Sequence, residues 1–515
     1  MPGVTQRRCW PLLYTAFLCT ILVLYAISHA IYSFPSANRG DEGTITASPH
    51  FLGSVQSYCR TGGSLPTGEK YMFYAPHSGF SNQVGELKNA LLIAAILNRT
   101  LVVPPIFDHH AIVLGSCPKF RVHEPYEMRA MAWAHISELF RDGRYLSIAD
   151  VLDITSVASL VKVMDFRVFS LFWCGVDILP ACSGSLCRSL AVHTPTRLGT
   201  LESCGALLSK PDQVPGNCVY GVDEDCRTTI WVHKKGAANL SFDQPLSYQK
   251  ETFTSSTKTQ EAKETNRKRK YGPKKIKEIQ ETLGDGAQVS NFEVLSFGSL
   301  FSSEYKGVQL HVDIESSSDT LVKDLVESMN FFPFTPPIVD AGKLYSKKRI
   351  RKSFFCAQLR LLDGQFKNHW KQTFTTFKSQ LKMVRDQQDP SQVLNVFIMT
   401  DLPRTNWSQT YLGELDEDKS YKLHTLNATD SLIEETAKRL SREDYGLRSG
   451  YFPPVNVKMD IQDSKPVKIH PDILLFIEEV ICSCADLGFV GTSGSTLSAN
   501  ILQLRSGNIC ISNVQ

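Results

Sequence analysis

An arginine that follows an apolar run in the second half of the chain has the chemistry to neutralise a phosphate. Arg360 comes directly after residues 353–359, SFFCAQL, which we expect to form a buried strand. Open α/β sheets bind ligands at the carboxyl ends of their strands. A guanidinium keeps its proton and can hold a diphosphate bidentately, so Arg360 could stabilise a departing diphosphate. From position alone, an ion pair with Asp363 explains the residue equally well.

A turn of small and hydroxylated residues further along the chain is a second candidate. Residues 486–498 read DLGFVGTSGSTLS, with a strand expected at 488–490 and a helix from Thr496 onward. Hydroxyls and unpaired backbone N–H groups at a helix start suit a phosphate. Ser495 and Thr496 are also of the residue types preferred as helix N-caps, and the two roles are compatible.

An aspartate follows another expected strand. Asp401 comes after residues 394–400, LNVFIMT. It would lie at the same edge of a parallel sheet as Arg360, where it could contact a ligand. An aspartate that caps the next turn is the alternative.

A loop near the start of the folded body is the fourth candidate. It joins an apolar run at 71–74 to residues with helical spacing from Val84, and a second apolar run follows at 101–103. Strand, helix and strand form a βαβ unit and therefore a parallel sheet. The loop then lies at the ligand edge and supplies His77, Gly79, Phe80, Ser81 and Asn82. His77 could act as a base near neutral pH, although a lone loop histidine is more often incidental.

These segments resemble the motifs of the GDP-fucose protein O-fucosyltransferases, in particular their plant relatives. Residues 79–83 with 98–105, GFSNQ and NRTLVVPP, are similar to the first motif of that family. Gln358-Leu359-Arg360 stands where the family has His-Leu-Arg, and residues 486–505 are similar to its last motif.

The resemblance implies roles for these residues. Arg360 would be the main catalytic residue, Asn82 would contact donor and acceptor, and the turn with Ser495, Thr496 and Leu497 would bind the nucleotide diphosphate. Three departures stand out: Gln358 replaces a histidine, Thr496 and Leu497 replace serine and phenylalanine, and Ser78 stands near the place of a loop glutamate found in some branches. The general base is therefore unassigned.

The N-terminal residues predict a membrane anchor. Residues 11–34 are almost wholly apolar and long enough to cross a bilayer, and Arg7 and Arg8 before them favour a cytoplasmic N-terminus at residues 1–10. A cleaved signal peptide is the alternative, with Ser28 and Ala30 as small residues at a cleavage site. Residues 35–66 would form a stem.

Cysteines and sequons agree with a lumenal body. Of 14 cysteines, 12 lie beyond the anchor and would face an oxidising compartment. Six lie between Cys174 and Cys226, and their pairing is not decided by the sequence. Four sequons are present, although Asn98 lies inside the βαβ unit, which argues against its modification. The four asparagines are Asn98, Asn239, Asn406 and Asn427.

Length and alternation predict two α/β domains. With 515 residues, the chain exceeds the usual size of one core. We expect an N-terminal domain at 67–335, on the acceptor side, and a C-terminal nucleotide-sugar domain at 336–515. Residues 245–290 have almost no large apolar side chains and predict a disordered loop. Two Rossmann-like domains facing a cleft would give a GT-B-like fold.

The predicted activity is transfer of fucose from GDP-fucose to a hydroxyl of a protein or glycan acceptor, in the Golgi membrane. Inversion and metal independence follow from the resemblance. The Asp-x-Asp patterns at 223–225 and 416–418 are the metal-binding alternative. A net charge of +3 gives no argument for nucleic-acid binding. Alternative functions are rhamnosyl or mannosyl transfer to cell-wall polysaccharide, and a catalytically inactive lumenal binding or scaffold protein.

Overall fold

The computed structural model divides the chain into two units, Met1–Gly53 and Ser54–Gln515, and all described residues belong to the second. The predicted anchor and stem, His77 and the 245–272 part of the predicted loop lie outside the described residues. The prediction of disorder is wrong for the remaining part, 273–290, which contains a short strand and the helix Ile276–Leu283, because Ile279 and Leu283 are buried in the core. In the described part, no helix combines the length and apolar character needed to cross a bilayer. The described residues are 68–76, 79–107, 125–174, 201–209, 218–222, 273–301, 310, 312–315, 319–362, 364–447, 451 and 469–510.

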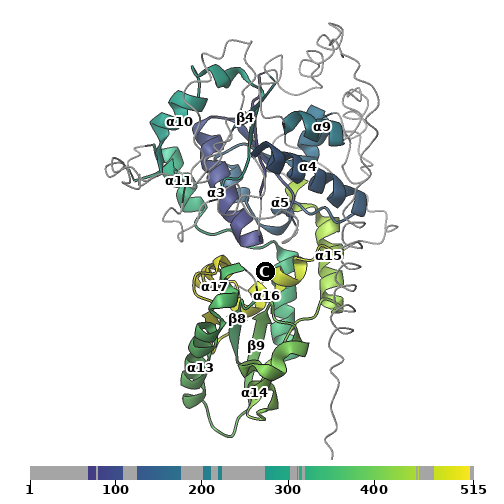
Figure 1. The fold of residues 1–515 in the computed structure, drawn as a ribbon, viewed down its shortest axis with the longest axis vertical. Coiled ribbons are helices and arrows are strands. Elements are labelled where there is room, and N and C mark those ends of the chain that lie inside the picture. The colour runs from purple at the N-terminus through teal and green to yellow at the C-terminus, as the bar shows by residue number, and fades with distance from the viewer. Residues whose placement is uncertain are drawn as a thin grey trace, which may run out of the picture. The chain divides into compact units, whose positions relative to one another are not determined.

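The first sheet is parallel throughout and has the strand order β3-β2-β1-β6-β4. Its central strand alternates between two cores: Met72 and Tyr74 face one, and Tyr71 and Phe73 face the other. In Figure 1, α3, α10 and α11 lie on one side of this sheet and α4 and α9 on the other. The strands are β1 (Tyr71–Tyr74), β2 (Thr100–Val103), β3 (Val163–Asp165), β4 (Val219–Val222) and β6 (Val294–Phe297).

The helices around this sheet include the expected one of the βαβ unit, α3, which joins β1 to β2. Short β5 (Lys274–Lys275) and β7 (Val312–Asp313) form a separate parallel pair. The helices and helical turns are α3 (Phe80–Ile96), α4 (Pro125–Asp142), α5 (Ile148–Val151), α6 (Thr155–Ala158), α7 (Phe166–Phe169), η1 (Ser170–Cys174), α9 (Leu201–Leu208), α10 (Ile276–Leu283), η3 (Gln288–Asn291) and α11 (Thr320–Ser328).

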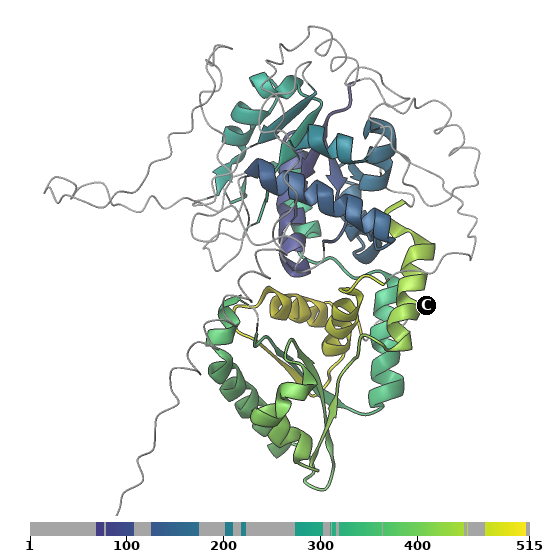
Figure 2. The same ribbon diagram turned by 45° about the vertical axis from the view of Figure 1, so that its right-hand side comes forward.

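The second sheet is also parallel, with the order β10-β9-β8-β11. Phe355, Ala357 and Leu359 of its central strand pack with α13 and α14, whereas Phe354 and Cys356 pack with α12, α15 and α16. The sheet lies in the lower, green and yellow part of Figures 1 and 2. The strands are β8 (Phe354–Leu359), β9 (Leu394–Thr400), β10 (Tyr421–His424) and β11 (Gly488–Gly491). The helices and helical turns are α12 (Pro336–Tyr345), η5 (Ser346–Ile350), η6 (Gly364–Asn368), α13 (Trp370–Asp386), η7 (Arg404–Gln409), α14 (Tyr411–Glu417), α15 (Ser431–Glu443), η8 (Tyr445–Leu447), α16 (Ile473–Ser483) and α17 (Thr496–Ser506).

The chain crosses between the two sheets more than once. Residues 333–335 hydrogen-bond to the backbone of Val151 and Asp153 before α12 begins. After α15, Asp444 returns to the first sheet, where its carboxylate accepts a 2.8 Å bond from Arg167. Two parallel α/β sheets are thus present, as expected, while the domain boundary at residue 335 stays a prediction.

Three disulfides lie wholly in the described part of the chain. Cys174–Cys204 joins η1 to α9, Cys356–Cys482 joins β8 to α16, and Cys484–Cys510 joins the end of α16 to the residues after α17. These bonds confirm the prediction that cysteines of the body form disulfides.

Candidate functional site

The three candidates of the second sheet meet at its carboxyl edge. Leu359 is in register with Thr400, and Gln358 is in register with Gly491. Because all strands run parallel, the residues that follow β8, β9 and β11 emerge side by side. Backbone hydrogen bonds confirm this arrangement: the N–H of Arg360 donates to Thr492 Oγ1 over 2.8 Å, and the N–H of Leu361 donates to Asp401 Oδ1 over 2.8 Å.

Arg360 is half-buried at this edge. Its guanidinium carbon lies 4.9 Å from the centre of the Phe366 ring in η6. Such a cation–π contact restrains the guanidinium. Asp363, the alternative partner considered from the sequence, lies outside the described residues.

Asp401 serves the loop after β8. Its two carboxylate oxygens accept the N–H groups of Leu361 and Leu362 over 2.8 and 3.0 Å. Asp401 therefore has the turn-capping role that was the alternative from the sequence. Its two bonds fix the path of the chain just after Arg360. The ligand contact predicted for Asp401 stays a prediction.

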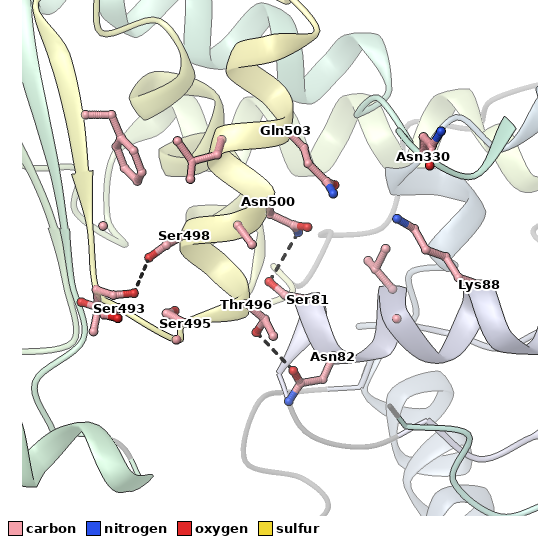
Figure 3. A pocket seen from close by; sticks show the side chains of 18 of the residues that line it. Ser81, Asn82, Lys88, Asn330, Ser493, Ser495, Thr496, Ser498, Asn500 and Gln503 are labelled. Carbon is pink, nitrogen blue, oxygen red and sulfur yellow. Dashed lines mark hydrogen bonds between the residues drawn. The ribbon is translucent and has the colours of Figure 1, made fainter. Parts of the chain in front are cut away.

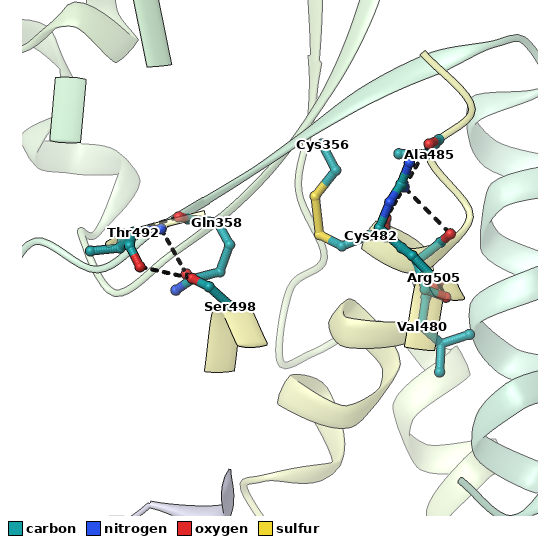
Figure 4. Close-up of a disulfide and its surroundings, with 9 residues drawn as sticks. Cys356, Gln358, Val480, Cys482, Ala485, Thr492, Ser498 and Arg505 are labelled. Carbon is teal, nitrogen blue, oxygen red and sulfur yellow. Dashed lines mark hydrogen bonds between the residues drawn. A yellow bond between two sulfur atoms is a disulfide. The ribbon is translucent and has the colours of Figure 1, made fainter. Parts of the chain in front are cut away.

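Gln358 supports the turn before α17 from behind (Figure 4). The side chain is buried, and its Oε1 accepts a 2.6 Å bond from Ser498 Oγ and a 3.4 Å bond from the N–H of Thr492. The resemblance implies a substrate contact for Gln358, but its carbonyl oxygen is turned into this buried network. The physical reason is strand alternation, which places Gln358 on the same face of β8 as Cys356.

The two elements that hold this turn, β8 and α17, are both attached to α16. The Cys356–Cys482 disulfide ties β8 to α16. Arg505 of α17 donates to the carbonyl oxygens of Cys482 and Ala485 over 3.1 and 2.7 Å. The turn at 491–496 is thus held between a strand and a helix that are joined covalently.

The opening loop of the first sheet meets this turn directly (Figure 3). Thr496 Oγ1 donates to Asn82 Oδ1 over 3.2 Å, and Asn500 Nδ2 donates to Ser81 Oγ over 3.4 Å. Gly79 is the N-cap residue of α3 and places Ser81 and Asn82 in its first turn. The structure therefore brings together two candidate segments that are separated by more than 400 residues.

A pocket of about 910 Å³ lies along these contacts. It is bordered by α3, α11, α13, the β11 strand and α17. Of the predicted site residues, Ser81, Asn82, Ser495 and Thr496 line it. Hydroxyl and amide groups dominate the rest of the polar lining, and Lys88 is the one charged side chain among the described lining residues. The further polar lining residues are Lys88, Asn330, Thr376, Gln380, Thr492, Ser493, Ser498, Asn500 and Gln503.

Phe80, predicted as a substrate contact, has a packing role instead. Its side chain is buried, and its ring centre lies 4.4 Å from that of Phe476 and 6.3 Å from that of Phe334. Leu497, also predicted to contact substrate, packs half-buried against the same apolar core. Both partners of Phe80 come from distant parts of the chain, so the sequence carried no local signal of this cluster.

Residues 98 and 99, in the second half of the first family motif, have structural roles. Asn98 has φ of 49° and ends α3 in the left-handed conformation that asparagine tolerates. The guanidinium of the buried Arg99 donates to the carbonyl oxygens of Phe292 and Ser290 over 2.9 and 3.1 Å. These bonds hold the chain before β6 against the end of α3.

Sequence reasoning did not find Lys88, Asn330 or Gln503. One signal was available, since Ser81, Gly85 and Lys88 have the i, i+4, i+7 spacing of one helix face. No local sequence signal marked Asn330 or Gln503, because their place in the pocket depends on how α11 and α17 pack against α3.

The metal-binding alternative gains no support at 416–418. Asp416 pairs with Arg404 at 3.0 Å, and Asp418 Oδ1 accepts bonds from Ser420. No cluster of three or more His, Cys, Asp or Glu side chains suited to a metal occurs within the described ranges. Asp223 and Asp225 lie outside them, and metal independence stays a prediction.

Three of the four predicted glycosylation sites are placed. The Asn98, Asn406 and Asn427 side chains are exposed. Asn239 lies outside the described residues, and modification of any of the four stays a prediction.

No family model matches. A curated protein of Arabidopsis thaliana, O-fucosyltransferase 30, is 40% identical over 508 residues, which cover 96% of this chain and 94% of that protein. A crystal structure of POFUT1 in its apo form has a TM-score of 0.38 and 12% identity, covering 86% of this chain and 97% of that one. POFUT1 in complex with GDP-fucose gives 0.37 and 11%, with 86% and 95% covered. TM-scores this low carry no weight for fold or function.

Proposed function

The chain belongs to the O-fucosyltransferase family, and we propose that it is a glycosyltransferase that transfers fucose from GDP-fucose to a hydroxyl group of a protein or glycan acceptor. The observation that carries this proposal is 40% identity over almost the full length of both chains. Fucose as the sugar is supported by the name of that relative, and GDP-fucose as the donor by the sequence resemblance.

The site geometry supports a role for Arg360 in leaving-group stabilisation. In the proposed reaction, the acceptor oxygen bonds to C1 of fucose while the bond from C1 to the phosphate oxygen breaks. The electron pair leaves with GDP, so negative charge grows on the phosphate. A guanidinium at this edge of the sheet, carried by a residue whose backbone N–H contacts the Thr492 hydroxyl, lowers the energy of that charge in the transition state.

Asn82 is positioned to organise the reacting sugar. It lies at the contact between the first turn of α3 and the start of α17. From there its amide can reach groups on either side of the turn. The acceptor proton must pass to a base or to water, and we assign no residue to this step. Inversion and independence of metal remain part of the proposal.

We also propose a lumenal location, with residues 11–34 as a type II signal anchor of the Golgi membrane. The three described disulfides support a compartment of the secretory pathway, because disulfides persist under oxidising conditions. Exposed sequon asparagines at 98, 406 and 427 are compatible with the same location.

A donor panel tests the proposed activity. Full-length protein, purified in detergent from secretory expression, would be assayed for release of GDP from GDP-fucose, GDP-mannose and GDP-glucose, and of UDP from UDP-rhamnose. We expect turnover with GDP-fucose alone. Turnover only with another donor would replace the sugar, and absence of binding to GDP at millimolar concentration would favour a scaffold protein.

A further inference from the structure

Lys88 places a partly buried positive charge in the wall of the pocket. It lies on the same face of α3 as Ser81 and Gly85, two turns further along the helix. Its ammonium lies 5.7 Å from the centre of the Phe332 ring. No acidic side chain is present among the described residues that line the pocket, and no ion pair joins Lys88 to a carboxylate in the described ranges.

The charge of Lys88 is therefore costly in this structure. Burial lowers the pKa of the Lys88 ammonium, and no neighbouring carboxylate offsets that effect. A cation withdrawn from water is stabilised when an anion approaches it. The buried Glu479 borders a narrower neighbouring cavity together with Lys88, but burial raises the pKa of its carboxyl well above the ordinary range, which favours the neutral form. The anion that pairs with Lys88 would therefore come from a ligand.

The position of Lys88 separates it from the place proposed for the diphosphate. Asn82 touches Thr496 at the turn. Lys88 follows Asn82 by six residues, which corresponds to about 9 Å along the axis of α3. Figure 3 shows Lys88 and Asn330 at the end of the pocket away from Ser493 and Ser495. Lys88 thus faces the region beyond the sugar rather than the nucleotide side of the turn.

The neighbouring polar groups suit a carbohydrate. The amides of Asn330, Asn500 and Gln503 and the hydroxyls of Ser81 and Thr376 line the same pocket. Amide and hydroxyl groups both donate and accept, which matches the many hydroxyls of a glycan.

We propose that Lys88 binds the carboxylate of an acidic sugar in the acceptor, so that the enzyme acts on a uronic acid-containing glycan. This inference rests on the proposed function, in that it assumes an acceptor in the pocket. Lys88 would select the acceptor and would take no part in breaking the bond to the donor.

Binding measurements with matched ligands test the inference. Full-length protein saturated with GDP would be titrated calorimetrically with an oligogalacturonate, with its fully methyl-esterified form and with an acidic peptide of equal charge. We expect the oligogalacturonate to bind at least tenfold more tightly than its ester. Lys88→Met should lower its affinity to that of the ester, and Lys88→Arg should keep most of the preference.

Lys382→Met is the matched control, because Lys382 is exposed on α13 and does not line the pocket. We expect it to bind every ligand as the unmodified protein does. GDP affinity should be unchanged in all three variants.

Several outcomes would overturn the inference. It is excluded if the protein binds acid and ester equally or binds neither of them. It is also excluded if the protein prefers the acidic peptide, or if the preference for the acid survives Lys88→Met. A tenfold loss of GDP affinity in Lys88→Met would assign the lysine to the diphosphate instead. Failure of the proposed function has a different signature: the unmodified protein would then neither bind GDP nor release it from GDP-fucose.

Discussion

Arginines of the two sheets are used in opposite ways. In the first sheet, the fully enclosed Arg167 donates to Asp165 and Asp444 over 2.8 Å and to Asp150 over 3.0 Å. In the second sheet, Arg360 is half-buried and lies at the end of a strand. A guanidinium surrounded by buried carboxylates contributes to folding, whereas one at the ligand edge of a sheet can serve chemistry.

The largest expected effect is on folding, from loss of Arg167. Arg167→Met would leave the buried carboxylates of Asp150, Asp165 and Asp444 without their cation, which costs about 3–5 kcal/mol. We expect low secretion and an unfolding midpoint shifted strongly downward in guanidinium chloride. The exposed Arg442→Met on α15 is the control. A normal midpoint for Arg167→Met would show that the cluster does not hold the two regions together.

Next in size is the effect of Arg360 on catalysis. Arg360→Ala should slow GDP-fucose turnover about 100- to 1000-fold, the usual range for loss of one transition-state donor. Its free energy of unfolding should stay within about 1 kcal/mol of the original, since surface changes seldom exceed that. Arg360→Lys keeps the charge but loses the bidentate geometry, and should recover only part of the rate. Full activity of Arg360→Ala would refute the leaving-group role and remove the contrast with Arg167.

The acidic excess around Arg167 predicts a dependence of stability on pH. Burial raises the pKa of Asp444 to about 7, above an unfolded value near 4. The folded state therefore binds the proton more tightly, so this contribution is complete below pH 4 and is lost as pH rises toward 7. We expect the free energy of unfolding to fall by about 1 kcal/mol per pH unit over that window.

Asp444→Asn separates this cause from others, because the amide oxygen still accepts from Arg167 but does not titrate. Denaturant unfolding at pH 5 and pH 7 should show a smaller difference in the variant than in the unmodified protein. Burial also raises the pKa of Glu478 to about 8, so part of the slope should remain. An unchanged slope in Asp444→Asn would place the dependence elsewhere.

The smallest effect concerns one of the hydrogen bonds between α3 and α17. Thr496→Val removes the donor to Asn82 while keeping the shape of the side chain. A neutral hydrogen bond contributes about 0.5–1.5 kcal/mol, so we expect a change of roughly two- to tenfold in the KM for donor. The paired variant Asn82→Ala with Thr496→Val should be less than additive if the bond matters in the working enzyme.

Local patterns predicted the elements that carry the site. The apolar run before Pro76, the stripe from Val84 and the run at 394–400 became β1, α3 and β9 with nearly the expected bounds. Strand ends in parallel sheets then located Arg360, Asp401 and the turn with Thr496 at one edge. This reasoning works because strand direction and alternation are set by neighbouring residues in the sequence.

Roles that depend on distant packing were beyond such reasoning. Phe80 is buried because Phe334 and Phe476 surround it, and the Arg167 cluster draws Asp444 from 277 residues away. Gln358 is an intermediate case. The alternation of β8 already implied that Gln358 points away from Leu359, but only the packing of α17 shows that its Oε1 accepts a hydrogen bond from Ser498 Oγ.

The bond between Asn82 and Thr496 joins residues 414 positions apart. Contacts of such long range form only after the intervening chain has been ordered, since the entropy of closing the loop must be overcome first. During synthesis the first wall of the pocket leaves the ribosome long before the second. Catalytic activity can therefore appear only in a molecule that has completed its folding, and the assay of sugar transfer doubles as a sensor of correct maturation.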